Sequence, residues 1–307
     1  MLRTSKLCFI LLSFSFGAFA EEIKPVSSLV IEAQIQVGGD WMGIGFGSLW
    51  EASGGKLYRV SGADNSVQAQ IPVGPGAYRG IAIGKSHVFV PATGDQKLYK
   101  IDPNDNTVVG TLSLTFQGSE SSVGVDDKSV WIITTENSLQ PVLSQVDIET
   151  MSITSKTNLP SICAGVVYGF GSVWISCPQI NQVLQVDTIT KQIVKTIATH
   201  GSPRFITASD DSIWVLNQAD GSVQRIDPTT SEVNATIDAK LTGGGGDIAF
   251  GEGAIWVTMP GKPVCKVDPA TNTLSLVFSG FGFGDAIRAG LGSVWVSGGQ
   301  LHRIKVP

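Results

Sequence analysis

Charged residues are scarce in this sequence. Asp, Glu, Lys and Arg make up 15% of the 307 residues, and the net charge is −5. Soluble domains usually contain about 25% charged residues. Disorder requires low hydrophobicity together with high charge, so a chain that is 42% hydrophobic is not disordered. An acidic chain also lacks the basic surface on which nucleic-acid binding depends, so we expect no nucleic-acid partner.

Histidine and cysteine are also few. The sequence has three histidines, His87, His200 and His302, and four cysteines, and their spacings match no zinc-binding pattern. It has no Gly-x-Ser-x-Gly motif, which disfavours serine hydrolase chemistry. We therefore predict no metal site and no cofactor.

Long apolar runs are absent after the N-terminus. Residues 1–20 have the pattern of a secretory signal, with Arg3 and Lys6 before the apolar run Leu7–Phe16 and the small-residue site Ala18-Phe19-Ala20. An apolar run of this length is too short to span a bilayer as a helix. The sequence predicts a secreted or periplasmic protein with no membrane insertion after cleavage.

Glycine is abundant, and a repeat organises the rest of the chain. A small-polar, aliphatic, aromatic triplet occurs seven times, with its aromatic residues 39 to 43 positions apart, and it accounts for six of the seven Trp. The aromatic positions are Trp50, Phe89, Trp131, Trp174, Trp214, Trp256 and Trp295. We expect these side chains to fill the core between repeats.

Each repeat contains four short predicted strands separated by turn residues, which is the pattern of a propeller blade. The last repeat has room for only three strands, and Leu29–Val37 resembles the fourth strand of the first repeat. The fold prediction is therefore an all-β, seven-bladed propeller of four-stranded antiparallel blades, closed by the N-terminal strand pairing with the last blade. The predicted divisions are a signal peptide at 1–20, a short leader at 21–28 and a single domain at 29–307.

The repeat carries a family resemblance. Ser212–Asn217, Ile226-Asp227-Pro228 and Thr236-Ile237 resemble YVTN-type propeller repeats and those of the streptogramin (virginiamycin B) lyase group. The resemblance implies the propeller fold along residues 29–307. A streptogramin lyase would have His ten residues before some aromatic anchors and Glu or His three residues after others. This sequence has neither, so the lyase activity is not carried over.

Propellers usually bind at one mouth of the central channel, which is formed by the loops before the first strand and after the second strand of each blade. The repeat places polar residues there, with aromatic residues beside them. The resulting binding candidates are Asp40, Arg79, Arg204, Asp247, Asp285, Asn217, Trp41, Tyr78 and Phe205. The charged residues are either simply solvated or contact a ligand. Two guanidinium groups facing a narrow channel require an anion between them, which is either a ligand or one of the Asp residues.

Three cysteines remain after signal cleavage. With the turn of the fourth repeat centred at Phe170, Cys163 lies opposite Cys177 in a hairpin, close enough for a disulfide. The alternative is that both thiols stay reduced. Cys265, in a third strand, is expected to be free.

The functional prediction is an exported, monomeric propeller that binds a small molecule, a peptide or a partner protein at one channel mouth. A lyase or hydrolase that uses Asp and Arg at that mouth is the first alternative. A protein-interaction scaffold is the second.

Overall fold

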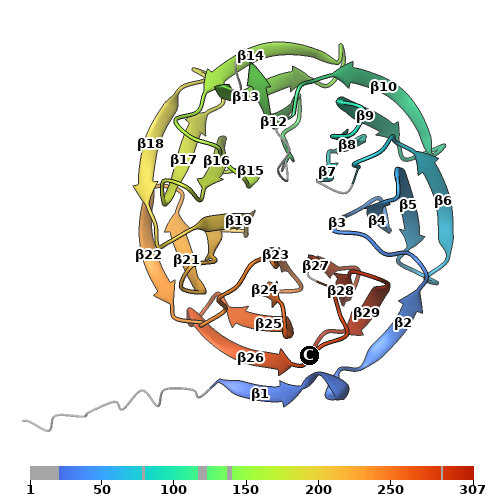
Figure 1. Cartoon of the computed structure of the whole chain (residues 1–307), viewed down its shortest axis with the longest axis vertical. Coiled ribbons are helices and arrows are strands. Elements are labelled where there is room, and N and C mark those ends of the chain that lie inside the picture. The colour runs from blue at the N-terminus through green and yellow to red at the C-terminus, as the bar shows by residue number, and fades with distance from the viewer. Residues whose placement is uncertain (1–20, 78–79, 117–122, 137–139, 285) are drawn as a thin grey trace, which may run out of the picture.

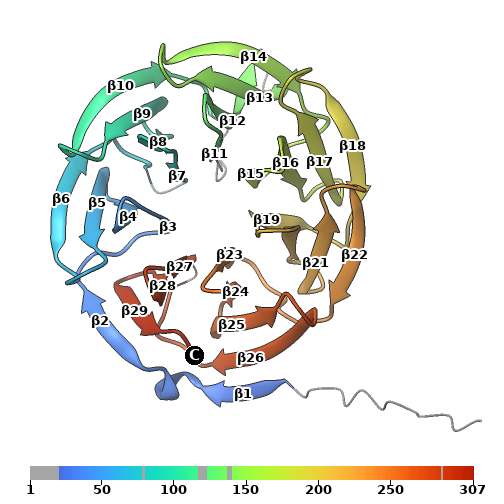
Figure 2. The ribbon, with the colours of Figure 1, turned by 180° about the vertical axis from the view of Figure 1, so that it is seen from behind.

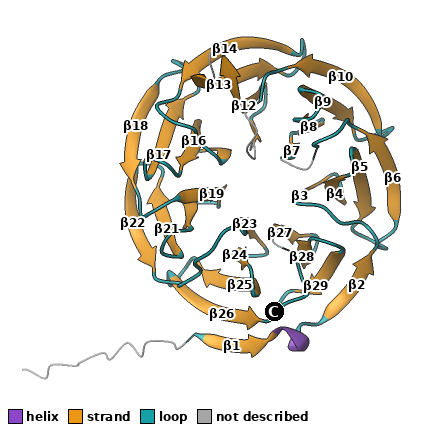
Figure 3. Ribbon diagram, in the orientation of Figure 1, coloured by secondary structure: helices purple, strands orange, loops and turns teal. Residues whose placement is uncertain are grey.

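A computed structural model describes residues 21–77, 80–116, 123–136, 140–284 and 286–307. The strands form seven sheets arranged radially around a central axis (Figure 1), and the same ring is seen from behind in Figure 2. Each blade has an innermost, a second, a third and an outer strand, joined by turns and loops (Figure 3). The predicted seven-bladed propeller with four-stranded antiparallel blades is confirmed.

The two inner strands of each blade surround the axis. The innermost strands are β3 (Trp41–Gly45), β7 (Ala82–Ile83), β11 (Val123–Val125), β15 (Val166–Gly169), β19 (Pro203–Ala208), β23 (Asp247–Gly251) and β27 (Ala286–Gly290). The second strands carry the aromatic anchors and are β4 (Ser48–Ser53), β8 (Val88–Ala92), β12 (Ser129–Glu136), β16 (Ser172–Cys177), β20 (Ile213–Asn217), β24 (Ala254–Met259) and β28 (Ser293–Ser297).

The two outer strands of each blade complete its sheet. The third strands are β5 (Lys56–Ser61), β9 (Lys97–Asp102), β13 (Gln140–Asp147), β17 (Gln182–Asp187), β21 (Ser222–Asp227), β25 (Lys262–Asp268) and β29 (Leu301–Lys305). The outer strands are β6 (Val67–Pro72), β10 (Thr107–Ser113), β14 (Ser152–Asn158), β18 (Ile193–Ala198), β22 (Glu232–Ile237), β26 (Thr273–Ser279) and, in the last blade, β2 (Ile31–Ile35).

The N-terminal strand closes the ring. β2 pairs antiparallel with β29, with Ile35 opposite Leu301, so the last blade takes its outer strand from the beginning of the chain. This confirms the predicted closure by Leu29–Val37. The predicted leader at 21–28 contains a strand that the repeat did not predict, because β1 (Glu22–Pro25) pairs parallel with β26 of the sixth blade. A 3₁₀ turn at Val26–Ser28 connects β1 to β2.

The anchor side chains are the core between blades. All six anchor Trp side chains and Phe89 have no exposed surface. Every anchor indole also donates a hydrogen bond to an oxygen near the turn between the first and second strands, such as Trp214 Nε1 to Ser209 Oγ at 3.1 Å. The repeat of aromatic residues therefore reflects packing, as predicted.

A basic side chain on the third strand ties some neighbouring blades together. Arg225 donates to Ser212 Oγ at 2.6 Å in its own blade, and to Pro269 O at 2.9 Å and Asn272 Oδ1 at 3.1 Å in the next. Its guanidinium lies 5.2 Å from the centre of the Trp214 ring. Arg59 and Arg303 make the equivalent contacts in the first and last blades.

The fourth blade contains a disulfide between Cys163 and Cys177, the pair expected from the sequence. Cys265 is a free, buried cysteine. The expected centre of the hairpin was wrong by half a residue. Gly169 pairs with Ser172, so the turn is formed by Phe170 and Gly171 together.

An extra residue in one strand of the hairpin offsets the half-residue difference in the position of the turn. Ala164 N donates to Ser176 O at 2.8 Å, while Ser176 N donates to Gly165 O at 2.9 Å. Two residues of one strand therefore face one residue of the other, which is a β-bulge. Beyond the bulge, Cys163 again lies opposite Cys177. A bulge that depends on local hydrogen bonds could not be placed from the repeat spacing.

Candidate functional site

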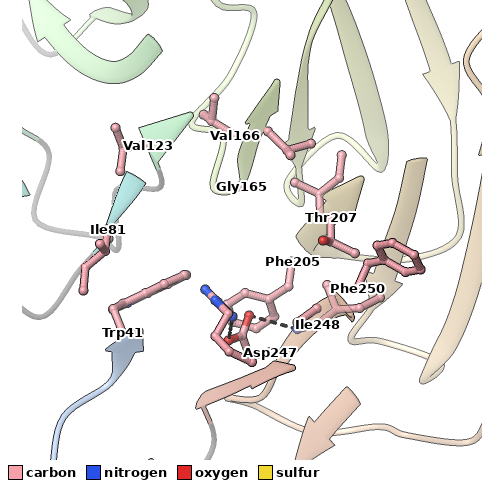
Figure 4. Close-up of a pocket in the computed structure, with 15 residues that line it drawn as sticks. Trp41, Ile81, Val123, Gly165, Val166, Phe205, Thr207, Asp247, Ile248 and Phe250 are labelled. Carbon is pink, nitrogen blue, oxygen red and sulfur yellow. Dashed lines mark hydrogen bonds and ion pairs between the residues drawn. The ribbon is translucent and has the colours of Figure 1, made fainter. Parts of the chain in front are cut away.

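A cavity of about 190 Å³ lies on the axis of the ring. All seven blades contribute to its wall, through residues on or next to their innermost strands. Figure 4 shows Trp41, Ile81, Val123, Phe205 and Asp247 around this space. Most of the lining residues are aliphatic or aromatic, while polar groups form about as much of the exposed wall as apolar ones. Ligand sites of proteins commonly combine apolar side chains with a few polar groups that orient the ligand.

Two aromatic residues form one wall of the cavity. The ring centres of Trp41 and Phe205 are 6.3 Å apart, and the rings are inclined by 51°. A guanidinium lies against the face of each ring: Arg288 is 5.7 Å from the centre of Trp41, and Arg204 is 5.7 Å from the centre of Phe205. The two rings therefore lie between two cations, with Arg204 against Phe205 of the fifth blade and Arg288 of the seventh blade against Trp41 of the first.

A buried ion pair lies beside the aromatic wall. Arg288 Nη1 donates to Asp247 Oδ2, and Arg288 Nε donates to Met42 O at 2.9 Å. Asp247 also accepts from two backbone amides, Ile248 N at 2.9 Å and Ile287 N at 3.2 Å. Burial raises the pKa of Asp247, and the positive charge of Arg288 opposes that shift.

The structure brings together some of the predicted mouth residues. Trp41, Phe205 and Asp247 all line the cavity. Asp40 is exposed, next to Trp41 in the chain, and Arg204 is half-buried beside Phe205. Tyr78, Arg79 and Asp285 lie outside the described residues.

Asn217 is placed differently from the other candidates. It is fully buried in the fifth blade, where its Nδ2 donates to Ser222 Oγ and to Gln224 Oε1, each at 3.0 Å. It does not line the cavity. Its hydrogen bonds give it a structural role within the blade.

Sequence reasoning missed Arg288, although the repeat contains a signal for it. Seven residues before the anchor aromatic, the other six blades have a small or uncharged residue, and only the last has a charged one. These positions are Gly43, Ala82, Gly124, Val167, Thr207, Ala249 and Arg288. The predicted candidates lie in loops or beside them, whereas Arg288 lies inside the innermost strand β27 and lines the axial cavity.

A second missed residue is Glu51. It directly follows an anchor Trp, at a position where the other blades have Val or Ile. Glu51 is fully buried at the contact between the first and last blades, where Ser297 Oγ donates to its Oε1. Its Oε2 is buried without a hydrogen-bond partner among the described residues. Burial raises the pKa of Glu51 to about 7, the hydrogen bonds from Ser297 and Gly39 oppose the shift, and the nearby charge of Asp40 adds to it.

Glu51 should therefore make the stability of the protein depend on pH. The folded protein holds the proton of the Glu51 carboxyl more tightly than the unfolded chain does, where this carboxyl has a pKa near 4.5. The contribution of the Glu51 carboxyl to the free energy of unfolding is fully present below about pH 4.5 and is lost as the pH rises through about 7. The loss amounts to about 3 kcal/mol, because one pKa unit corresponds to about 1.4 kcal/mol. Urea unfolding between pH 5 and 9 should show Glu51→Gln gaining stability relative to the wild type as the pH rises.

Glu232→Gln is the matched control, because Glu232 is an exposed residue on an outer strand. Its stability should differ from that of the wild type by a small amount that does not vary with pH. A constant difference between wild type and Glu51→Gln across this pH range would contradict the assignment.

Metal ligands do not gather in the described part of the chain. No group of three or more His, Cys, Asp or Glu side chains there is placed to hold a metal ion. Across the same residues, no helix has both the length and the apolar character needed to cross a membrane.

Solved structures with the same architecture share little sequence with this chain. The β-propeller domain of Cps50 (Swd1) from Myceliophteria thermophila is 13% identical, with a TM-score of 0.73 over 91% of this chain and 100% of that one. A chain of the mitotic checkpoint complex is 11% identical, with a TM-score of 0.75 over 98% and 99% of the two chains. BamB from Moraxella catarrhalis is 11% identical, with a TM-score of 0.60 over 91% and 100%.

At this level of identity the likeness establishes the fold alone, and propellers of one fold have many functions. The sequence matches no protein-family model and no curated protein. The function must therefore be argued from the site.

Proposed function

We propose that this protein is an exported β-propeller that binds a small molecule in the cavity on its axis. The observation that carries the proposal is the cavity itself. Its volume of about 190 Å³ suits a small molecule, whereas a stable partner protein needs roughly 800 Å² of surface on each side. Its wall combines aliphatic side chains and two aromatic rings with one buried ion pair, and so supplies both affinity and orientation.

Two features of the chain support export. Residues 1–20 have the charge and hydrophobicity pattern of a secretory signal. The disulfide between Cys163 and Cys177 is a bond that typically forms in oxidising compartments outside the cytosol.

Binding is favoured over lyase or hydrolase chemistry by the contacts of Asp247. A general base needs an oxygen free to take a proton from the substrate. Asp247 has a raised pKa, but hydrogen bonds from Ile248, Ile287 and Arg288 already use three of the roughly four acceptor positions of its carboxylate. This carboxylate therefore mainly holds Arg288 in place and has little capacity left to take a proton from a substrate.

A scaffold role receives less support from the surface. The most exposed large apolar side chains among the described residues are Ile189 and Phe281. Ile189 lies in a turn of the fourth blade, and Phe281 follows the outer strand of the sixth. They belong to different blades, whereas docking sites usually present a contiguous apolar patch.

Filling the cavity tests the proposal. Thr207 lines the cavity, and Thr207→Trp should place an indole in the space that a ligand occupies. Ligands found by thermal-shift screening of a small-molecule library should bind the wild type, and the variant should bind them at least tenfold more weakly by isothermal titration calorimetry.

Thr196→Trp is the control, because Thr196 is exposed on outer strand β18. It should bind the same ligands with unchanged affinity. Ligands that bind Thr207→Trp as tightly as the wild type would place the binding site elsewhere.

A further inference from the structure

The inference concerns Arg288 and rests on the proposed binding function. Its side chain lines the cavity and is 21% exposed. Three sets of contacts fix the position of the Arg288 side chain. Nε donates to Met42 O at 2.9 Å, and the guanidinium lies over Trp41. Nη1 donates to Ile287 O at 2.5 Å and also to Asp247 Oδ2. A guanidinium held in this way has already lost its side-chain freedom, so a ligand that binds it does not have to order it.

Asp247 holds this guanidinium and offers little to a ligand. Its side chain is 7% exposed, Oδ1 accepts from Ile248 N, and Oδ2 accepts from Ile287 N and from Arg288. Among the described residues, the contacts of Arg288 use Nε and Nη1, which leaves Nη2 available. The ion pair therefore presents N–H donors to the cavity, while most of its acceptor positions are already occupied.

The rest of the wall sets the shape and polarity of the ligand. Ile81, Val123, Val166 and Ile248 face the space together with the two aromatic rings. A cavity of about 150 Å³ with apolar walls is known to hold one benzene molecule. A cavity of about 190 Å³ therefore suits one ring, or a branched chain of similar size, together with a small polar head.

We propose that the cavity binds a small carboxylate with a compact apolar body, its carboxylate on Arg288 and its body against Trp41 and Phe205. A guanidinium matches a carboxylate in both charge and planar geometry, and such charge-assisted hydrogen bonds are roughly twice as strong as neutral ones. A ligand with an ammonium group would be repelled by Arg288. A neutral amide of the same size would keep the apolar contacts and lose the charge.

Three probes of the same size and shape test the proposal: benzoate, benzamide and benzylamine, each titrated calorimetrically into the wild-type protein at pH 7. Benzoate should bind at least tenfold more tightly than benzamide, and benzylamine should not bind. Added salt should weaken benzoate binding and leave benzamide binding unchanged, because only benzoate is charged. Equal affinities for benzoate and benzamide would overturn the proposal.

Two variants locate the effect. Arg288→Gln should weaken benzoate binding at least tenfold while benzamide affinity stays within threefold. Lys195→Gln, which removes an exposed cation from outer strand β18, should change neither. If Arg288→Gln does not fold because Asp247 is left unpaired, the three probes on the wild type still decide the question.

The outcomes separate this inference from the proposed function. If benzoate does not bind and other ligands bind in a manner sensitive to Thr207→Trp, the cavity is a binding site and the carboxylate assignment is wrong. If no ligand is sensitive to Thr207→Trp, both proposals fail.

Discussion

A chain that starts at Gly38 should be insoluble or strongly destabilised. It lacks β2, whose removal leaves the β29 backbone unpaired along the edge of the last blade. It also loses three buried aliphatic side chains, Leu29, Ile35 and Val37. At ~1.5–3 kcal/mol for each buried side chain, the loss is about 5–9 kcal/mol. That is comparable to the whole stability of a typical domain, ~5–15 kcal/mol.

The control for this truncation is a chain that starts at Val26. It lacks only β1, whose residues are exposed or half-buried, and it keeps β2 in place. Its melting temperature by circular dichroism should fall slightly, if at all. A soluble Gly38 chain with the melting temperature of the full domain would show that β2 does not close the ring.

Replacing an anchor Trp should cost stability without changing the binding site. Trp214 has no exposed surface, donates to Ser209 and packs beneath the Arg225 guanidinium. Trp214→Ala leaves a cavity in the core between blades, and truncations of this kind cost about 3–5 kcal/mol. Denaturant unfolding measures the loss. The fraction that folds should keep the ligand affinity of the wild type, because Trp214 does not line the axial cavity.

Trp41→Ala provides the contrast. Trp41 is nearly buried, but its exposed part lines the cavity and supports Arg288. This variant should lose affinity for any ligand of the cavity, with a loss of stability no larger than that of Trp214→Ala. A Trp214→Ala protein with unchanged stability and lost binding would reverse the two assignments.

The fold could be predicted from the sequence because the pattern that indicates it occurs seven times. One ambiguous strand, such as the two-residue β7, does not obscure a pattern that the other blades show clearly. β1 was missed for the opposite reason. Residues 22–25 have no counterpart in any repeat, and their parallel pairing with β26 depends on where the closed ring leaves an open edge.

The lining of the axial cavity could be predicted only in part, because the repeat marks loop positions more clearly than positions inside strands. Trp41, Phe205 and Asp247 were found because loop positions at the mouth can be counted from the anchors. Arg288 and Glu51 lie inside strands, where a charged residue is informative only by comparison with the equivalent position in the other blades. Asn217 satisfied the same count as the loop candidates, but hydrogen bonds within its blade turn it away from the cavity lining.

The closure of the ring also determines when folding can finish. β2 is among the first segments of the domain to be synthesised, and its partner β29 is the last strand. Their pairing joins residues near positions 35 and 301, so the entropy of closing a loop of almost the whole chain is lost in this one step. Contacts between distant residues slow folding. The first blades can assemble during synthesis, but β29 remains an open edge until the two ends of the domain meet.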